Sequence, residues 1–102
     1  MRLGIVVTDI NQAAQAQCVV KEALAYGWSL RCFLTENGVN MLKDDSFIGL
    51  ARNHGLHLSV CEHSVARYCH ELPLQEISDV VIVGGQYQDA ELVRHSDRVL
   101  VF

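Results

Sequence analysis

Two cysteines and three histidines fall within fifteen consecutive residues of the chain, 57–71, which read HLSVCEHSVARYCHE. Thiol and imidazole groups at such close spacing can bind a metal, form a redox pair or supply a single nucleophile. Which of these is possible depends on which residues of the segment belong to a strand and which belong to a helix. The segment therefore has to be placed within the secondary structure of the whole chain.

Apolar runs of strand length alternate with segments of helical periodicity along the chain. Continuous runs of β-branched and other apolar residues are typical of strands buried on both faces of a parallel sheet. Apolar residues three and four positions apart, with Gly27 and Pro73 as stops, are typical of helices. The predicted strands cover residues 3–7, 30–34, 56–60, 80–83 and 98–102. The predicted helical segments are 11–26 with Asn11 as N-cap, 39–43, a helix from Asp45 or Ser46 to Gly55, 62–72 and 86–95.

This alternation predicts a single domain, residues 1–102, with a three-layer α/β architecture around a mainly parallel five-stranded sheet. The order of the strands is left open. Half of the residues are hydrophobic and a fifth are charged, so we expect helices to cover both sheet faces and some apolar surface to be buried between subunits.

Charge and hydropathy restrict the class of partner. The formal net charge is −4 and no basic run occurs, which disfavours unaided binding to nucleic acid. The opening apolar run, residues 3–7, is shorter than a signal-peptide core, and no stretch is long enough to span a bilayer. The cytoplasm is therefore the expected compartment, where the four cysteines would be reduced.

Cys61 is the only strong nucleophile at the carboxyl end of a predicted strand, where open α/β sheets carry their functional residues. It follows the third strand and opens the next helix, so unpaired N–H groups and the helix dipole would favour its thiolate. The charge of Glu62 opposes this effect, and Arg67 or His63 could offset it. A buried and inert Cys61 is the competing interpretation. The other residues at these strand ends are Thr8, Asp9, residues 35–38 and residues 84–86.

The remaining cysteines are interpreted as structural. Cys69 lies eight residues after Cys61, about 12 Å along a helix axis, whereas a disulfide needs Cα atoms within about 7 Å, so Cys69 is predicted to be core. Cys32 alternates with leucines along a strand and is also predicted to be core, and Cys18 has no evident partner. Cys69 and His70 would point about 100° apart on a helix, and no zinc-site spacing occurs, so no metal is predicted.

A weaker interpretation starts from the five residues that separate Cys61 from Arg67. This is the spacing of the Cys-x5-Arg loop of thiol phosphatases, in which a curled backbone and an arginine hold phosphate. Such a loop usually needs glycine for its dihedral angles, and residues 62–66 contain none. No glycine-rich nucleotide-binding motif occurs in the chain either.

With Cys61 placed after the third strand, the chain resembles the DsrE/DsrF-like (TusD-type) family of small sulfur-relay proteins. The specific parts of the resemblance are the strand-to-cysteine step at residues 58–61 and the closing segment 96–102, which reads SDRVLVF. The opening strand at residues 2–7, followed by an Ala-rich helix, and the segment 33–39, which reads FLTENGV, are also similar to the family pattern.

The resemblance implies a flavodoxin-like sandwich that assembles into homo- or hetero-oligomers such as trimers or hexamers. It also implies that Cys61 accepts sulfane sulfur as a persulfide from a donor protein and passes it to a thiol of an acceptor protein. No metal, nucleotide or flavin cofactor is implied. Tyr87 or Leu42 could contribute to the surface that receives a partner. A non-catalytic oligomeric scaffold or binding subunit of the same fold is the alternative function.

Overall fold

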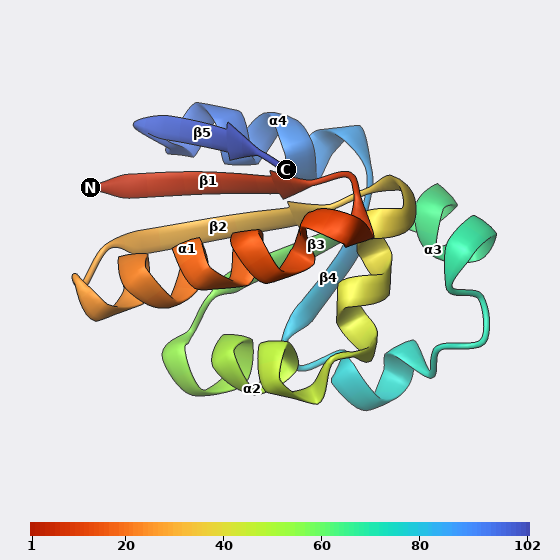
Figure 1. Cartoon of the computed structure of the whole chain (residues 1–102). Helices are drawn as coiled ribbons and strands as arrows, with labels where there is room; N and C mark the ends of the chain where they lie inside the picture. Colours follow the sequence, from red (N-terminus) through yellow and green to blue (C-terminus); the bar gives the residue numbers. More distant parts are fainter.

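Five parallel strands form a single sheet in the computed structural model, which describes all of residues 1–102. The strands are β1 (Arg2–Val7), β2 (Ser29–Leu34), β3 (His57–Cys61), β4 (Val81–Gly84) and β5 (Arg98–Val101). Their order across the sheet is β4-β3-β2-β1-β5 (Figure 1). All five predicted strands are confirmed to within one or two residues at each end.

Helices connect every strand to the next and complete the three layers. The α-helices are α1 (Ala13–Ala25), α2 (Asp45–His54), α3 (Glu62–Tyr68) and α4 (Gln86–His95). Short 3-10 segments are η1 (Ile10–Gln12), η2 (Glu36–Lys43) and η3 (Leu74–Ile77). The predicted three-layer α/β sandwich is confirmed, and its layers are those of a flavodoxin-like fold. None of these helices has the length and apolar character needed to cross a membrane.

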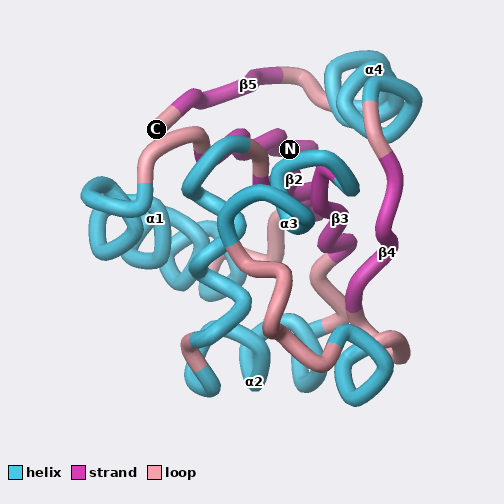
Figure 2. Tube along the Cα trace, turned by 90° about the vertical axis from the view of Figure 1, so that its right-hand side faces the viewer, coloured by secondary structure: helices cyan, strands magenta, loops and turns pink.

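The strand order explains which face each helix covers. Each of the first three crossovers steps outward from β1 through β2 and β3 to β4, so right-handed connections place their helices on one face. The last crossover returns across the sheet to β5, and its helix α4 therefore lies on the opposite face. Figure 2 shows α1 and α4 on opposite sides of the strands. The order differs from the 2-1-3-4-5 of flavodoxin itself.

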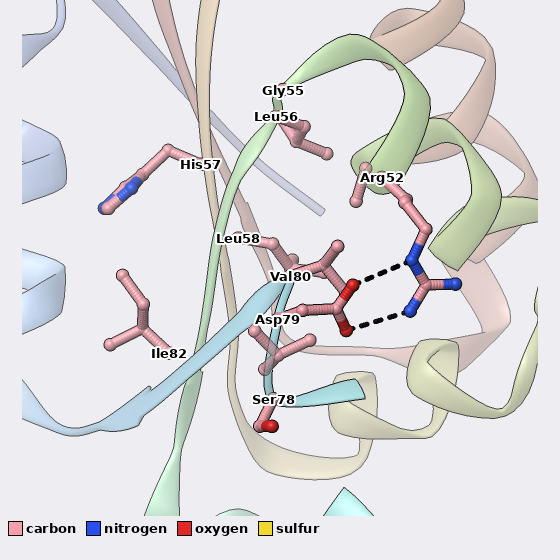
Figure 3. A pocket seen from close by; sticks show the side chains of 11 residues that line it. Arg52, Gly55, Leu56, His57, Leu58, Ser78, Asp79, Val80 and Ile82 are labelled. Atoms are coloured by element: carbon pink, nitrogen blue, oxygen red, sulfur yellow. Dashed lines mark hydrogen bonds and ion pairs between the residues drawn. The ribbon is translucent and has the colours of Figure 1, made fainter. Parts of the chain in front are cut away.

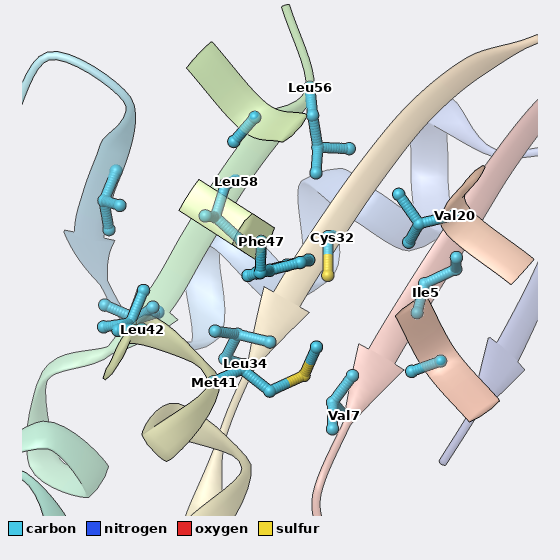
Figure 4. Packing of buried hydrophobic residues seen from close by; sticks show 14 of the residues in the cluster. Ile5, Val7, Val20, Cys32, Leu34, Met41, Leu42, Phe47, Leu56 and Leu58 are labelled. Carbon is cyan, nitrogen blue, oxygen red and sulfur yellow. The ribbon is translucent and has the colours of Figure 1, made fainter. Parts of the chain in front are cut away.

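The two faces carry very unequal cores. The α1 and α2 face buries a cluster of 21 residues, in which the fully buried Phe47 lies beside Leu58 of β3 and Cys32 of β2 (Figure 4). The α4 face buries only Val6, Phe33 and Leu92 as a second cluster. Gly4 allows α4 to approach β1 closely, because a Cβ there would lie 2.6 Å from both Leu92 and Ser96. The core is therefore concentrated on one side of the sheet.

Several predicted helix boundaries are wrong. The helix predicted over residues 62–72 ends at Tyr68, because the backbone of Cys69, with φ −150° and ψ 31°, leaves the helical conformation. Asp44, rather than Asp45 or Ser46, caps α2 by accepting a hydrogen bond from the N–H of Ser46. The first helix starts with the 3-10 segment η1, which Asp9 caps, and α1 begins only at Ala13. Gly55 ends α2 as predicted, with a left-handed φ of 67°.

Candidate functional site

Cys61 lies where the direction of the chain connections changes. It is the last residue of β3 and the residue before α3, and it pairs in register with Gly84 at the end of β4. The chain leaves β3 toward the face of α1 and α2, but leaves β4 toward the face of α4. In open α/β sheets, ligands bind in the crevice between two strands whose connections diverge in this way. The topology therefore places Cys61 at the expected position of a site.

The Cys61 side chain lines a cavity of about 230 Å³ on the α4 face of the sheet. The thiol is partly exposed, so it is not sealed beneath other side chains. Other residues that line the cavity are Val6, Phe33, Thr35, Gly85, Gln86 and Asp89. Of the strand-end residues singled out in the sequence, residues 35, 85 and 86 are thus brought together with Cys61. Thr8 and Asp9 are not part of this cavity.

The surroundings of the sulfur favour the thiolate. Partial burial raises the pKa of the Cys61 thiol, but nearby hydrogen-bond donors lower it more, so that its net pKa lies below the ordinary value. These donors are the hydroxyl and N–H of Ser64, the N–H of His63 and the hydroxyl of Thr35. The Cys61 side chain makes no N-cap hydrogen bond to α3. The nearby donors instead lower the pKa because they stabilise the negatively charged thiolate over the neutral thiol.

Ser64 connects the start of α3 to the segment after β2. Its buried Oγ accepts a hydrogen bond of 2.8 Å from the N–H of Glu36 and lies 3.3 Å from Oγ1 of Thr35. Glu36 has a φ of 50°, and it is the one non-glycine residue of the chain with positive φ. Backbone strain of this kind costs on the order of 1 kcal/mol and persists where surrounding contacts hold it, often next to functional groups.

The sequence offered Arg67 or His63 as a residue that could offset the charge of Glu62, and neither side chain is among the groups that shift the pKa of Cys61. The guanidinium of Arg67 instead lies 5.1 Å from the ring centre of Tyr68, and His63 acts through its N–H. Ser64 was missed, although a hydroxyl three residues after a strand-end cysteine is a recognisable spacing for the first turn of a helix.

The other three cysteines differ from Cys61 in their environment. Cys32 and Cys69 are buried in the main core, as predicted, and burial raises the pKa of Cys32 to about 12. Burial also raises the pKa of Cys69, whose S–H donates to the carbonyl oxygen of Val39 at 3.8 Å. Cys18 is exposed on α1, and all four thiols are free. Cys61 is accessible from outside, has a lowered pKa and lines a cavity at the carboxyl edge of the sheet.

Two other kinds of site lack the geometry that they need. No three side chains of His, Cys, Asp or Glu come together as metal ligands anywhere in the chain. Residues 62–68 form the helix α3 rather than a curled loop, so the backbone between Cys61 and Arg67 builds no nest for a phosphate group.

A cavity of about 340 Å³ lies at the opposite end of β3 and β4 from Cys61. Figure 3 shows Arg52 and Asp79 on one side of it, joined by two hydrogen bonds of 2.9 Å each, while His57 and Ile82 point to the other side of the strands. This cavity contains no thiol, and its Ser78 hydroxyl donates to the carbonyl oxygen of Gln75, so we place the candidate site at Cys61. Comparison of the chain with family models, with curated proteins and with solved structures finds no match.

Proposed function

We propose that the protein is a sulfur carrier in which Cys61 holds sulfane sulfur as a persulfide and transfers it to a thiol of a partner protein. The observation that carries the proposal is that Cys61 is partly exposed, opens into a cavity at the divergence of β3 and β4, and has a lowered pKa. The resemblance of residues 58–61 to sulfur-relay proteins points in the same direction, but the proposal depends on the geometry.

The reaction consists of two thiol exchanges without net oxidation. The Cys61 thiolate attacks the terminal sulfur of a donor persulfide, R–S–SH, so that a new S–S bond forms, the donor S–S bond breaks and R–S⁻ leaves. The proton stays on the terminal sulfur, which gives Cys61–S–SH. An acceptor thiolate then attacks that terminal sulfur, and Cys61 leaves as a thiolate. No metal, nucleotide or flavin takes part in either step.

A lowered pKa of Cys61 assists both exchanges. In the first exchange it increases the fraction of attacking thiolate at neutral pH, and in the second it makes Cys61 a better leaving group. The cavity walls suit the intermediate, because Val6 and the ring of Phe33 provide an apolar surface next to the thiol. Sulfur is soft and polarizable and makes favourable contacts with aromatic rings. The terminal sulfur would thus be held partly away from water.

A partner protein must reach the carboxyl edge of the sheet to exchange sulfur. Tyr87 follows directly after Gln86, a cavity residue, and its side chain is 71% exposed, so it is available for contact with a partner. Leu42 is only 3% exposed and belongs to the main core. The expectation that Leu42 could form part of a docking surface is therefore wrong.

Loading of sulfur onto Cys61 is the direct test. After treatment with polysulfide or with a rhodanese-bound persulfide, intact-mass spectrometry is expected to show a gain of one sulfur atom. Peptide mapping should place that atom on Cys61. The gain should disappear in Cys61→Ser and persist in Cys18→Ser, which removes the other exposed thiol.

The same measurement separates the proposal from a non-catalytic scaffold. A scaffold would remain unmodified at Cys61 under conditions that load a rhodanese. Sulfur found only on Cys18 would equally contradict the carrier proposal, because that thiol lies on α1 and outside the cavity. Discharge of the loaded protein by a small thiol should return the mass to its starting value, as the second exchange requires.

A further inference from the structure

Arg31 is a half-buried arginine with no ionic or hydrogen-bonding partner in the chain. It lies on β2, in register with Gly4 of β1, and Gly4 faces α4. The Arg31 side chain therefore extends beneath α4. Most of the other cations of the protein are paired with carboxylates: Arg2 with Asp97, Lys43 with Glu71, Arg52 with Asp79 and Arg94 with Glu91.

Two histidines lie close to Arg31. His57 is the register partner of Arg31 on β3, so both side chains lie on the same face of the sheet. Burial lowers the pKa of His57 most, and the positive charges of Arg31 and His95 lower it further. His95 ends α4, where its Nε2 lies 3.0 Å from Oε2 of Glu91. No carboxylate approaches the guanidinium of Arg31 within ion-pair distance.

A cavity of about 100 Å³ lies in front of Arg31, at the amino-terminal ends of β1 and β2. The residues that line it are Arg2, Leu3, Ser29, Arg31, His95 and Ser96. Arg2 keeps some of its N–H groups free, because its pair with Asp97 uses only one guanidinium nitrogen, at 3.1 Å. The hydroxyl of Ser29 has no partner in the chain. The free donors of the lining are thus those of Arg2, Ser29 and Arg31, since the Ser96 hydroxyl donates to Leu92, and the lining contains no carboxylate.

From the unpaired Arg31, the cavity and its donor lining, we infer that this cavity binds a small tetrahedral oxyanion with two negative charges, either free or as the phosphoryl group of a larger molecule. A guanidinium remains charged at all physiological pH values and presents a fork of donors that matches such oxygens. Withdrawing this charge from water without a counter-charge costs free energy, which a bound anion would recover. Arg2 and Arg31 thus form a local concentration of positive charge in a chain whose net charge is −4.

Sulfate is the appropriate probe, because it stays dianionic across the pH range in which histidines titrate. Calorimetric titration of the whole protein with sulfate, against chloride at equal ionic strength, should show one saturable site. Arg31→Gln is expected to weaken binding about tenfold or more, as the loss of charge-assisted hydrogen bonds predicts. Arg67→Gln is the matched control and should bind normally, because Arg67 is exposed and stacked on Tyr68.

The pH dependence gives a second readout. His57 lies next to Arg31 and its pKa is below the ordinary histidine value of about 6.5, so sulfate affinity should rise mainly as the pH falls below that value. The charged neighbours of His57 are Arg31 and His95. The charged neighbours of His95 are Glu91 and Arg94. The nearby carboxylates of Glu91 and Asp97 are already paired with Arg94 and Arg2. Cys61→Ser should leave sulfate affinity unchanged, because the cavity is at the opposite end of the strands. This result would hold whether or not Cys61 carries sulfur.

Equal sulfate affinity of Arg31→Gln and Arg67→Gln, or binding no stronger than that of chloride, would overturn the inference. If Arg31→Gln does not fold, Arg31→Lys keeps the charge and loses only the donor fork. It should fold and bind sulfate several-fold more weakly, and wild-type affinity in that variant would also contradict the inference. Glycerol phosphate separates the two sources of the anion: comparable affinity indicates a phosphoryl group, and its rejection indicates a free oxyanion.

Discussion

Replacing Gly38 with alanine is expected to lower the free energy of unfolding by about 3 kcal/mol, the upper end of what an added methyl group typically costs at a close-packed position. The new Cβ would lie 2.3 Å from the carbonyl oxygen of Val7 and 2.8 Å from its carbonyl carbon. These backbone atoms belong to a central strand and cannot rotate away as a flexible side chain can. Urea unfolding would measure the change. Each kcal/mol should also lower Tm by about 4–8 °C.

Gly49 provides the matched control for this substitution. It lies in the middle of α2, and a Cβ there would meet nothing within 4 Å. Gly49→Ala should therefore raise the free energy of unfolding by about 0.5–1 kcal/mol, since alanine is the better helix residue. Equal effects of the two substitutions would show that the close contact between Gly38 and Val7 is not a determinant of stability.

Removing the hydroxyl of Ser64 is expected to raise the pKa of Cys61 and to slow its reaction with iodoacetamide at neutral pH. The Ser64 hydroxyl makes the largest contribution among the donors that lower this pKa, while the burial that raises it would remain. Each unit of increase reduces the thiolate fraction about tenfold when the pH lies below the pKa. The alkylation rate of Ser64→Ala, measured against pH, should therefore rise at a higher pH than in the unsubstituted protein.

This measurement needs a background in which Cys61 is the only reactive thiol. Cys18→Ser supplies it, because Cys32 and Cys69 are buried. Thr35 offers a graded comparison in the same background: Thr35→Val removes its hydroxyl at nearly constant volume, and Thr35→Ser retains it. We expect a smaller upward shift in the pH profile for the first and none for the second. An unchanged profile in Ser64→Ala would rule out hydroxyl stabilisation of the thiolate.

The positions of the strands and the burial of Cys32 and Cys69 could be predicted from the sequence, because they depend on local apolar patterns. The strand order could not, because β1 pairs with β5 through residues such as Leu3 and Arg98, which lie 95 positions apart. The end of α3 was misplaced for a related reason. Val65 and Cys69 keep helical spacing, but Cys69 reaches the core through its contact with Val39 of η2 without continuing the helix.

At the site, the position of Cys61 followed from local sequence, whereas its polar surroundings did not. Ser64 is informative only once η2 is known to return toward the start of α3, where Glu36 can donate to its Oγ. Thr35 was recognised as a strand-end residue, but its proximity to the sulfur depends on the neighbouring register of β2 and β3. Contacts of this kind between connecting segments leave no periodic signal in the sequence.

The unequal cores on the two sheet faces imply that local unfolding is easier on the α4 face than on the α1 and α2 face. The α4 face is held by the small cluster of Val6, Phe33 and Leu92, and the neighbouring edge strand β5 leaves Val101 67% exposed. Partial detachment of α4 would therefore require less free energy than global unfolding, since the 21-residue cluster on the other face would stay intact. Detachment of α4 would move Gln86 and Asp89 away from Cys61. The thiol would then be more exposed while the rest of the sheet remained folded.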